Sequence, residues 1–324
     1  MTREVGPAIV RDDRAVVTTG TFDGVHLGHR AIVAYLVDRA RAAGGVPTVV
    51  TFSPHPREVI TGERVPLLTT LDERADLLEA LGVERFVVLP FSRALSQLSA
   101  QDYVDDVLLG QVGMREIVVG YDHRFGRARE GSRETLDRIG AARGFSVDVI
   151  PEQITGAGEG VSADGPTPGV TVSSSEIRRR LLDDGDAAGA ALLLGRPYQI
   201  RGPVVKGDQR GRTIGFPTAN VQPSDPAKLV PKTGVYAVRV RLRSGRLAPG
   251  MMNVGVRPTF ETDGRRTVEV HLFDFAGDLY GQTLAVDVVA RLRDERRFDG
   301  IDALVAQLRE DARRARDAST DRRP

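Results

Sequence analysis

Two histidines lie three residues apart in the string GTFDGVHLGHR, which runs from Gly20 to Arg30. The string follows an apolar run and leads into a helical pattern, so backbone N–H groups at the helix start face any anion bound there. The spacing puts His26 and His29 on nearly the same side of that helix. Two imidazoles there can stabilise the charge that grows on a transferring phosphoryl group, and Gly28 lets a ligand approach the backbone closely. The alternative is a structural turn that carries two surface histidines.

A second candidate site is glycine-rich and covers VVKGDQRGRTIGFPTANV, residues 204–221. A glycine-rich segment between strands can bend over a nucleotide and offer its N–H groups to the phosphates. Thr218 and Asn220 are two residues apart in an extended stretch, so both side chains point to one side. Their oxygens, together with the phosphates of ATP, suit Mg²⁺. The alternative is a glycine-rich hairpin with a capped turn. The glycines recur every four residues, at Gly207, Gly211 and Gly215.

A carboxylate on a predicted strand completes the second set of candidates. Glu269 lies in VEVHLFDF, residues 268–275, opposite the apolar face that Val268 and Val270 form. A carboxylate fixed on a strand can accept a proton from an attacking hydroxyl. The alternative is an ordinary exposed strand residue, which is what an isolated glutamate in this position would be.

The first half of the chain must position the histidines. Helical patterns at residues 27–43, 71–81 and 100–109 separate continuous apolar runs. This alternation predicts an α/β fold, a Rossmann-like parallel sheet covered by helices on both faces. Ligands of such sheets bind beyond the carboxyl ends of the strands. The apolar runs, which we predict as strands, are residues 15–19, 46–52, 85–89, 116–119 and 145–150.

The second half must position the glycines and Glu269. Apolar residues there alternate with polar ones, as in 236–243, 267–273 and 284–290. This period of two predicts strands with two unlike faces and a small antiparallel β-barrel. A helical pattern from residue 301 closes the domain, and we expect the charged tail from about residue 313 onward to be frayed.

The boundary between the two halves is predicted at Gly195-Arg196-Pro197, where the helical patterns of residues 173–182 and 186–194 end. We therefore expect an α/β domain over residues 1–194 and a barrel domain over residues 195–324.

Composition narrows the classes of protein. The 45 basic and 44 acidic side chains nearly cancel, so no excess of positive charge indicates a nucleic-acid partner. The chain has no cysteine, which excludes a disulfide scaffold, thiolate-bound metal and a cysteine nucleophile. Nothing near the N-terminus resembles a charged leader followed by an apolar core, and no apolar run approaches about 18 residues. We expect a cytoplasmic protein without membrane or nucleic-acid partners, either a monomer or a weak homo-oligomer.

The string from Gly20 to Arg30 resembles the H-x-G-H signature of the nucleotidyltransferase superfamily, whose members bind ATP in an α/β domain and release pyrophosphate. Three further strings, TFSPHPREV, VVGYDHRFGR and VSSSEIRRRL, extend the likeness. Together they resemble the adenylyltransferase half of the prokaryotic bifunctional riboflavin kinase/FMN adenylyltransferase (FAD synthetase) family. The resemblance implies adenylyl-transfer roles for His26 and His29 and nucleotide-binding roles for Gly20, Phe22, Asp23, Gly24, His55, Asp122, Ser173, Ser174 and Arg178.

The second half resembles the riboflavin kinase domain of the same family over its full length. The resemblance depends on the string PTAN, followed some 50 residues later by Glu269, and on the strings GVYAV, MMNVGVRPTF and LRDERRFDGIDALVAQLRED. The resemblance implies that Glu269 is the base for the terminal ribityl hydroxyl, and that Thr218 and Asn220 hold Mg-ATP. It also implies that residues 207–215 cover the phosphates and that the isoalloxazine lies near residues 293–298, with Arg297 and Phe298 as contacts.

These observations predict a two-step flavin enzyme. The barrel phosphorylates riboflavin with Mg-ATP to give FMN, and the α/β domain adenylylates FMN to give FAD and pyrophosphate. His123 departs from the aromatic residue usual in the family. It leaves open a first domain that transfers a nucleotidyl group to another phosphate ester or serves as an inactive ATP-binding regulator. The Arg-rich end, residues 291–323, leaves open a flavin- or nucleic-acid-binding module, although Asp and Glu are interspersed there.

Overall fold

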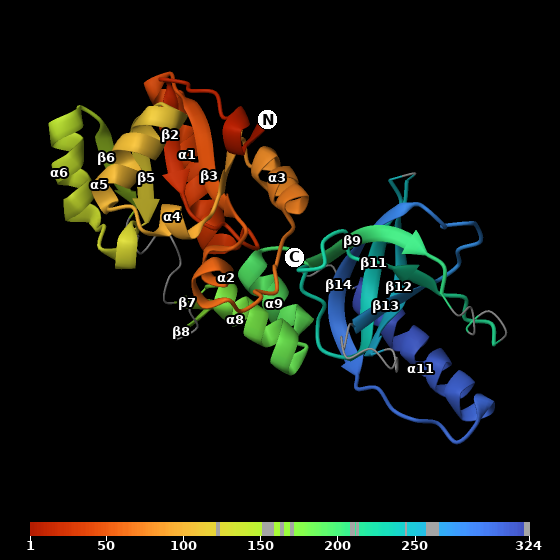
Figure 1. The fold of residues 1–324 in the computed structure, drawn as a ribbon. Coiled ribbons are helices and arrows are strands. Elements are labelled where there is room, and N and C mark those ends of the chain that lie inside the picture. The colour runs from red at the N-terminus through yellow and green to blue at the C-terminus, as the bar shows by residue number, and fades with distance from the viewer. Residues whose placement is uncertain are drawn as a thin grey trace. The chain divides into compact units, whose positions relative to one another are not determined.

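The computed structural model describes residues 1–120, 124–150, 159–162, 165–168, 172–207, 211, 214–243, 245–256 and 266–320. The chain divides into two compact units. The first comprises Met1–Gly160 and Pro168–Ser173, and the second comprises Val161–Thr167 and Ser174–Pro324. Each unit has its own sheet and its own hydrophobic core (Figure 1).

The first unit contains a six-stranded sheet in the order β1-β4-β3-β2-β5-β6. All neighbouring strands are parallel, which confirms the predicted α/β architecture. The strands are β1 (Thr2–Val5), β2 (Ala15–Thr19), β3 (Val46–Ser53), β4 (Arg85–Pro90), β5 (Met114–Gly120) and β6 (Ser146–Ile150). A separate two-stranded sheet pairs β7 (Glu159–Ser162) with β8 (Gly165–Pro168).

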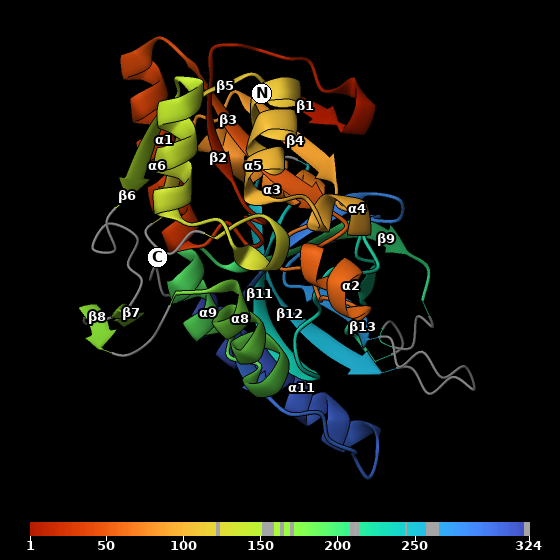
Figure 2. The ribbon, with the colours of Figure 1, turned by 60° about the vertical axis from the view of Figure 1, so that its left-hand side comes forward.

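Helices cover both faces of the parallel sheet, because successive strand residues point to opposite faces and both sets are apolar. Val17 packs in a core with η2 (Tyr103–Val112) and α6 (Arg133–Arg143), whereas its neighbour Val16 packs in a core with α1 (Leu27–Ala43) and α3 (Leu71–Ala80). Figure 2 shows α1, α3 and α6 around the strands of this sheet. The helices are α1 (Leu27–Ala43), α2 (Pro56–Thr61), α3 (Leu71–Ala80), α4 (Arg93–Ser96), α5 (Ala100–Asp102), α6 (Arg133–Arg143), the 3-10 helices η1 (Gly6–Ala8) and η3 (Arg127–Arg129), and the π-helix η2 (Tyr103–Val112).

Two elements of this unit differ from the sequence expectation. Strand β1 was not predicted, because its four residues are mostly exposed at the sheet edge and carry no apolar run. The helical pattern of residues 100–109 forms a single turn of α5 and then continues as the π-helix η2 to Val112. The apolar spacing predicts that this face is buried, and it is, but it does not distinguish the wider π turn from an α turn.

The second unit contains a closed antiparallel barrel in the order β10-β13-β12-β11-β14-β9, which confirms the predicted barrel. The alternation of apolar residues sends side chains such as Val238, Val268 and Val286 into the barrel interior, where each is almost fully buried. The strands are β9 (Tyr198–Val205), β10 (Ala219–Val221), β11 (Gly234–Arg241), β12 (Leu247–Val256), β13 (Arg266–Leu272) and β14 (Thr283–Arg293).

Helix α11 (Ile301–Thr320) packs on the outside of the barrel against β11, β12 and β14. The expectation of a frayed tail from residue 313 is wrong up to Thr320. Ala315 is fully buried in a core with Ala237 and Met251, and Arg316 makes an ion pair with Asp274 at 2.6 Å. These contacts hold residues 313–320 on the barrel, although the charged composition of this stretch predicted an end exposed to solvent.

A short helical segment precedes the barrel and belongs to its compact unit. It consists of α8 (Ser174–Arg179), the π-helix η4 (Arg180–Asp184) and α9 (Ala187–Leu194). Helix α9 packs on β9 and β14, and Lys232 donates through its backbone N–H to Leu181 and through Nζ to the carbonyl of Asp183. The division between the compact units thus comes before this segment, at Ser173 and Ser174. The domain boundary predicted from the sequence, at residues 195–197, comes after it and stays a prediction.

Candidate active sites in the two units

The histidine string forms the turn between β2 and α1. His26 is the N-cap of α1, and its Nδ1 accepts the backbone N–H of His29 at 3.3 Å. The two imidazole rings stack with their centroids 3.6 Å apart and an angle of 16° between their planes. The alternative of two surface histidines is not what is found, since His26 is only 7% exposed. Both rings therefore sit at the start of a 17-residue helix, where an anion is favoured.

The surroundings of His29 favour its neutral form. Burial lowers its pKa well below the usual 6.5, and the positive charges of His26 and Arg74 lower the pKa further. Its Nδ1 is buried and has no hydrogen-bond partner within the ranges that the structure covers. The Phe22 ring lies 4.9 Å from the His29 ring, centroid to centroid. A neutral imidazole has one ring nitrogen that donates and one that accepts.

Other residues predicted to bind the nucleotide lie in or near the same turn, but they face different ways. Gly20 is packed against Phe22, because a Cβ on Gly20 would lie 3.2 Å from that ring. Asp23 is fully buried, and its carboxylate accepts the backbone N–H groups of Leu68 and Thr69 at 3.0 and 2.9 Å. The N–H of Gly24 donates to the Thr69 hydroxyl at 2.9 Å.

Two further predicted residues follow strands β3 and β5, which lie on either side of β2. His55 is the N-cap of α2, and its Nδ1 accepts the backbone N–H of Arg57 at 3.1 Å. Because β2 and β3 are parallel, the turns at Thr21 and His55 leave the same edge of the sheet. Asp122 and His123 lie outside the described residues, three or fewer positions beyond the end of β5.

The serine and arginine candidates fall on both sides of the division between the units. Ser173 ends the first unit, whereas Ser174 and Arg178 lie on α8 in the second. On the same helix, Glu176 accepts hydrogen bonds from two arginines, and the closer pairing with Arg179 lowers the pKa of its carboxyl to about 2. The roles of these three candidates stay predictions.

The barrel brings Thr218, Asn220 and Glu269 together. Asn220 on β10 is the direct cross-strand partner of Glu269 on β13, so their side chains project from the same face. The Thr218 hydroxyl donates to Oε2 of Glu269 at 3.3 Å. Val268 and Val270, the neighbours of Glu269, point into the barrel. The structure thus brings these three oxygen-bearing side chains together, and their roles stay predictions.

Sequence reasoning missed Asn253 in this set. It lies on β12 directly opposite Glu269, on the side away from Asn220, and it donates through Nδ2 to Glu295 at 3.3 Å. Three side chains from three strands thus form a row across β10, β13 and β12. Only the strand register places Asn253 there, although the string MMNVGVRPTF contains it.

The glycine-rich segment approaches the same residues. A Cβ on Gly207 would lie 2.1 Å from Nδ2 of Asn220, and one on Gly211 would lie 2.2 Å from the carbonyl oxygen of Phe216. Gly215 has a φ of +81°, which side chains disfavour. A side chain would therefore meet a close neighbour at Gly207 and Gly211, and it would require a strained backbone at Gly215. Residues 208–210 and 212–213 lie outside the described ranges.

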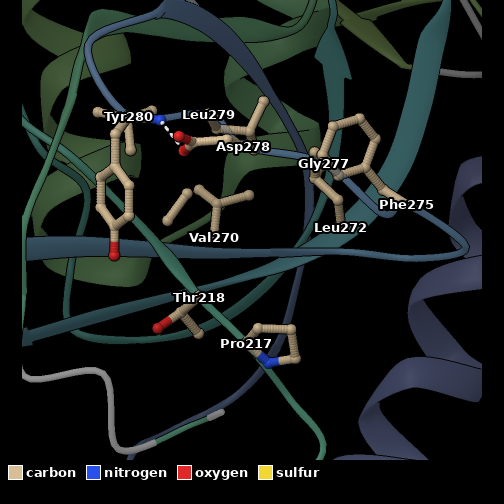
Figure 3. A pocket seen from close by; sticks show the side chains of 11 residues that line it. Pro217, Thr218, Val270, Leu272, Phe275, Gly277, Asp278, Leu279 and Tyr280 are labelled. Carbon is tan, nitrogen blue, oxygen red and sulfur yellow. Dashed lines mark hydrogen bonds between the residues drawn. The ribbon is translucent and has the colours of Figure 1, made fainter.

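A cavity of about 430 Å³ opens next to Thr218. In Figure 3 the rings of Tyr280 and Phe275 stand on either side of Val270, with Thr218 and Pro217 below them. The far wall is the connection between β13 and β14, which sequence reasoning did not single out. A pair of aromatic residues around a glycine in FAGDLY was the available signal. The lining residues are Val204, Pro217, Thr218, Ala219, Val270, Leu272, Phe275, Gly277, Asp278, Leu279 and Tyr280.

The predicted flavin contacts lie between β14 and α11. Phe298 is half-buried, and the guanidinium carbons of Arg293 and Arg296 lie 5.7 and 4.8 Å from its ring centroid. Arg297 is exposed. Arg293 is anchored to Asp311 of α11, which is fully buried, by an ion pair of 2.7 Å.

Over the part of the chain that the structure describes, no helix has both the length and the apolar character needed to cross a membrane.

Comparisons with known proteins match both units. The model of the FAD synthetase family matches residues 9–164, and the riboflavin kinase (flavokinase) model matches residues 194–319. A bifunctional riboflavin kinase/FMN adenylyltransferase of Pseudomonas fluorescens is 41% identical over 93% of this chain and 92% of its own length. The protein of that name from Escherichia coli strain K12 is 39% identical over 93% of this chain and 92% of its own length.

A solved structure described as a macrolide-efflux protein from Streptococcus pneumoniae has a TM-score of 0.82 and 31% identity, over 98% of this chain and 99% of that one. The curated relatives and the two family models agree on one assignment for the whole chain. The chain belongs to the bifunctional riboflavin kinase/FMN adenylyltransferase family.

Proposed function

We propose that the barrel transfers the γ-phosphoryl group of Mg-ATP to riboflavin, and that the α/β unit then transfers an adenylyl group from a second ATP to FMN. The observation that carries this proposal is the hydrogen-bonded pair of Thr218 and Glu269 beside Asn220, in the half of the chain that matches the riboflavin kinase model. The FAD synthetase model covers the half that holds the stacked histidines.

In the kinase step, Glu269 accepts the proton of the terminal ribityl hydroxyl. The hydroxyl oxygen bonds to the γ-phosphorus, the bond from that phosphorus to the β–γ bridging oxygen breaks, and ADP leaves. Thr218 holds one carboxylate oxygen of Glu269 at 3.3 Å, which fixes the direction in which the base faces. A hydrogen bond and a rigid strand restrict the carboxylate to few orientations, so that it is already aligned for proton transfer.

The donor set of this site fits Mg²⁺. A threonine hydroxyl and an asparagine side-chain oxygen are hard oxygen ligands, and Mg²⁺ commonly takes few protein ligands together with substrate phosphates and water. Gly207 packs directly on the Asn220 amide, which limits the positions that this side chain can occupy. Thr218 and Asn220 would hold the ion, which when bound neutralises charge on the phosphates of ATP.

The cavity beside Thr218 fits the base of ATP. Its volume of about 430 Å³ lies in the range typical of small-molecule pockets. Its walls combine aliphatic residues such as Val270 and Leu272 with the rings of Phe275 and Tyr280, which suits a flat apolar ring. A nucleotide with its base here has its phosphates near Thr218 and Glu269.

In the adenylyl step, a phosphate oxygen of FMN attacks the α-phosphorus of ATP, and the bond from that phosphorus to pyrophosphate breaks. No proton has to leave a phosphate dianion, so the protein needs mainly to position the two groups and stabilise charge. The N-terminus of α1 and the stacked imidazoles of His26 and His29 supply that stabilisation.

A chromatographic assay tests the proposal. The purified chain is incubated with riboflavin, ATP and Mg²⁺, and the flavins are separated at several times. FMN that rises first and FAD that follows are expected. Accumulation of FMN without FAD would refute the adenylyl step and favour another acceptor for the first unit. Unchanged riboflavin would refute the kinase step.

A further inference from the structure

The turn that carries the histidines has an unfavourable backbone. Between the end of β2 and the start of α1, φ is +47° at Phe22, +86° at Gly24 and +41° at Val25. Only glycine adopts such angles readily, and a β-branched residue such as valine rarely does. Phe22 and Val25 are nevertheless buried, at 2% and 1% exposed. A conformation of this kind persists only where the surrounding structure holds it.

Asp23 lies at the centre of this turn and points into the protein. Its side chain has no exposed surface, and it accepts hydrogen bonds from the N–H groups of Leu68 and Thr69 and from the Thr69 hydroxyl at 3.1 Å. The N–H of Gly24 in turn donates to the Thr69 hydroxyl. The turn is thus tied to the segment that precedes α3 by hydrogen bonds at Asp23 and Gly24, which lie between the strained residues Phe22 and Val25.

Arg74 of α3 connects this segment to the neighbouring strand. Its guanidinium donates to Asp23 at 3.4 Å, to the Thr69 carbonyl at 3.2 Å and to the Thr51 hydroxyl on β3 at 3.2 Å. Thr51 then donates to the carbonyl of Thr21, the first residue of the turn, at 3.0 Å. Arg74 is 3% exposed. One planar group therefore links the start of the turn, through Thr51, and its centre, at Asp23, to β3 and α3.

We propose, on the basis of the proposed adenylyl transfer, that Arg74 and Asp23 are positioning residues: their buried pair holds the turn that sets the stacked rings of His26 and His29. Neither residue is placed to contact the nucleotide, because both are buried and both are engaged in hydrogen bonds within the protein, including those to Thr51, Leu68 and Thr69 and the pair between them. This differs from the expectation that Asp23 itself binds ATP.

Substitution at the pair tests the proposal with the kinase as internal control. Arg74→Lys keeps the positive charge, but the single ammonium of lysine cannot reach Asp23 and Thr51 together as the branched guanidinium does. A displacement of about 1 Å in a catalytic group can cost about 10²-fold in rate. We expect the kcat for FAD formation from FMN to fall by about 10- to 100-fold in Arg74→Lys and Asp23→Asn, with the KM for ATP within about threefold of the wild type. FMN formation from riboflavin stays unchanged.

A matched control is Arg39→Lys in the same unit, because Arg39 pairs with Glu116 and Asp148 at the far end of α1. It should leave both activities near the wild-type values. A rise in the KM for ATP with unchanged kcat in Asp23→Asn would overturn the proposal and make Asp23 a ligand. Wild-type rates in both pair variants would overturn it as well. Absence of FAD formation in the wild type would instead refute the proposed function.

A double-mutant cycle covers the case in which a single variant folds poorly. If Asp23 and Arg74 act only through their contact with each other, their substitutions should not add. The double variant Asp23→Asn, Arg74→Met should then reduce kcat by no more than the more damaging of its two single substitutions. Thr51→Val, which removes one hydroxyl and leaves the pair intact, should cause a smaller loss, about threefold to tenfold. The proposal would be contradicted if the fold-reduction of kcat in the double variant equalled the product of the two single fold-reductions.

Discussion

Thr218 and Glu269 are joined by a hydrogen bond of 3.3 Å, although Thr218 directly precedes β10 and Glu269 lies on β13, 51 positions further along the chain. The bond fixes the carboxylate beside Asn220, its neighbour in the strand register. The proposed proton acceptor and the two proposed oxygen ligands thereby share one face of the barrel, next to the cavity that Tyr280 and Phe275 help to line.

Glu269→Gln removes the proposed proton acceptor and keeps the shape of the side chain. General-base catalysis is worth about 10²- to 10⁴-fold, so FMN formation should fall by that factor. FAD formation from supplied FMN should remain at the wild-type rate, as both rates measured by chromatography would show. Glu310→Gln, a change of an exposed carboxylate on α11, is the control. Equal loss of both activities in Glu269→Gln would argue against separate sites.

Thr218→Ser and Thr218→Val separate the hydroxyl from the methyl group of this side chain. Serine can keep the hydrogen bond to Glu269, whereas valine, of similar shape, cannot. We expect riboflavin phosphorylation to fall at least about tenfold in the valine variant and by less in the serine variant. Equal rates in the two would mean that the hydroxyl is not required.

Gly207→Ala tests the close approach of the glycine-rich segment. The added Cβ would lie 2.1 Å from Nδ2 of Asn220, so that amide must move. Kinase activity should drop, and the Mg²⁺ concentration for half-maximal rate should rise, because Asn220 is a proposed ligand. A titration of the rate with Mg²⁺ checks this. An unchanged midpoint would show that Asn220 does not hold the ion.

The low pKa of His29 makes stability depend on pH in a defined direction. The unfolded chain binds a proton near pH 6.5, whereas the folded chain binds it only at lower pH. Between those two values the unfolded state holds more protons, so the free energy of unfolding falls as the pH falls through that window. The loss approaches at most about 1.4 kcal/mol per pH unit.

Denaturant titrations at several pH values measure this effect, with His29→Asn as the comparison. The difference in unfolding free energy between the two proteins should shrink below pH 6.5, since asparagine does not titrate. A constant difference over the whole range would show that His29 titrates normally in the folded protein.

Much of the fold follows from apolar periodicity. The continuous apolar runs at residues 46–52 and 85–89 predict strands covered on both faces, and the alternation over residues 267–273 predicts a barrel strand. The structure has β3, β4 and β13 at these places. The extent of α11 did not follow, because its last turns are fixed by partners distant in sequence, such as Asp274. Local composition carries no information about such contacts.

The candidate sites show the same division. His26, His29, Thr218 and Glu269 were found because rare residue types or specific strings mark them. Asn253 and Arg74 were not, because the first is placed by cross-strand register and the second by burial against Asp23. One arginine among many has no distinguishing signal in this chain.

Complementation between two variants tests most directly whether one polypeptide carries two independent sites. His29→Ala and Glu269→Gln are each incubated with riboflavin, ATP and Mg²⁺, singly and as an equal mixture, and the flavins are separated. His29→Ala alone should stop at FMN, and Glu269→Gln alone should leave riboflavin almost unchanged. The mixture should produce FAD, because FMN made by one variant is adenylylated by the other. A mixture that accumulates FMN without FAD, although Glu269→Gln converts supplied FMN, would contradict two sites that work independently.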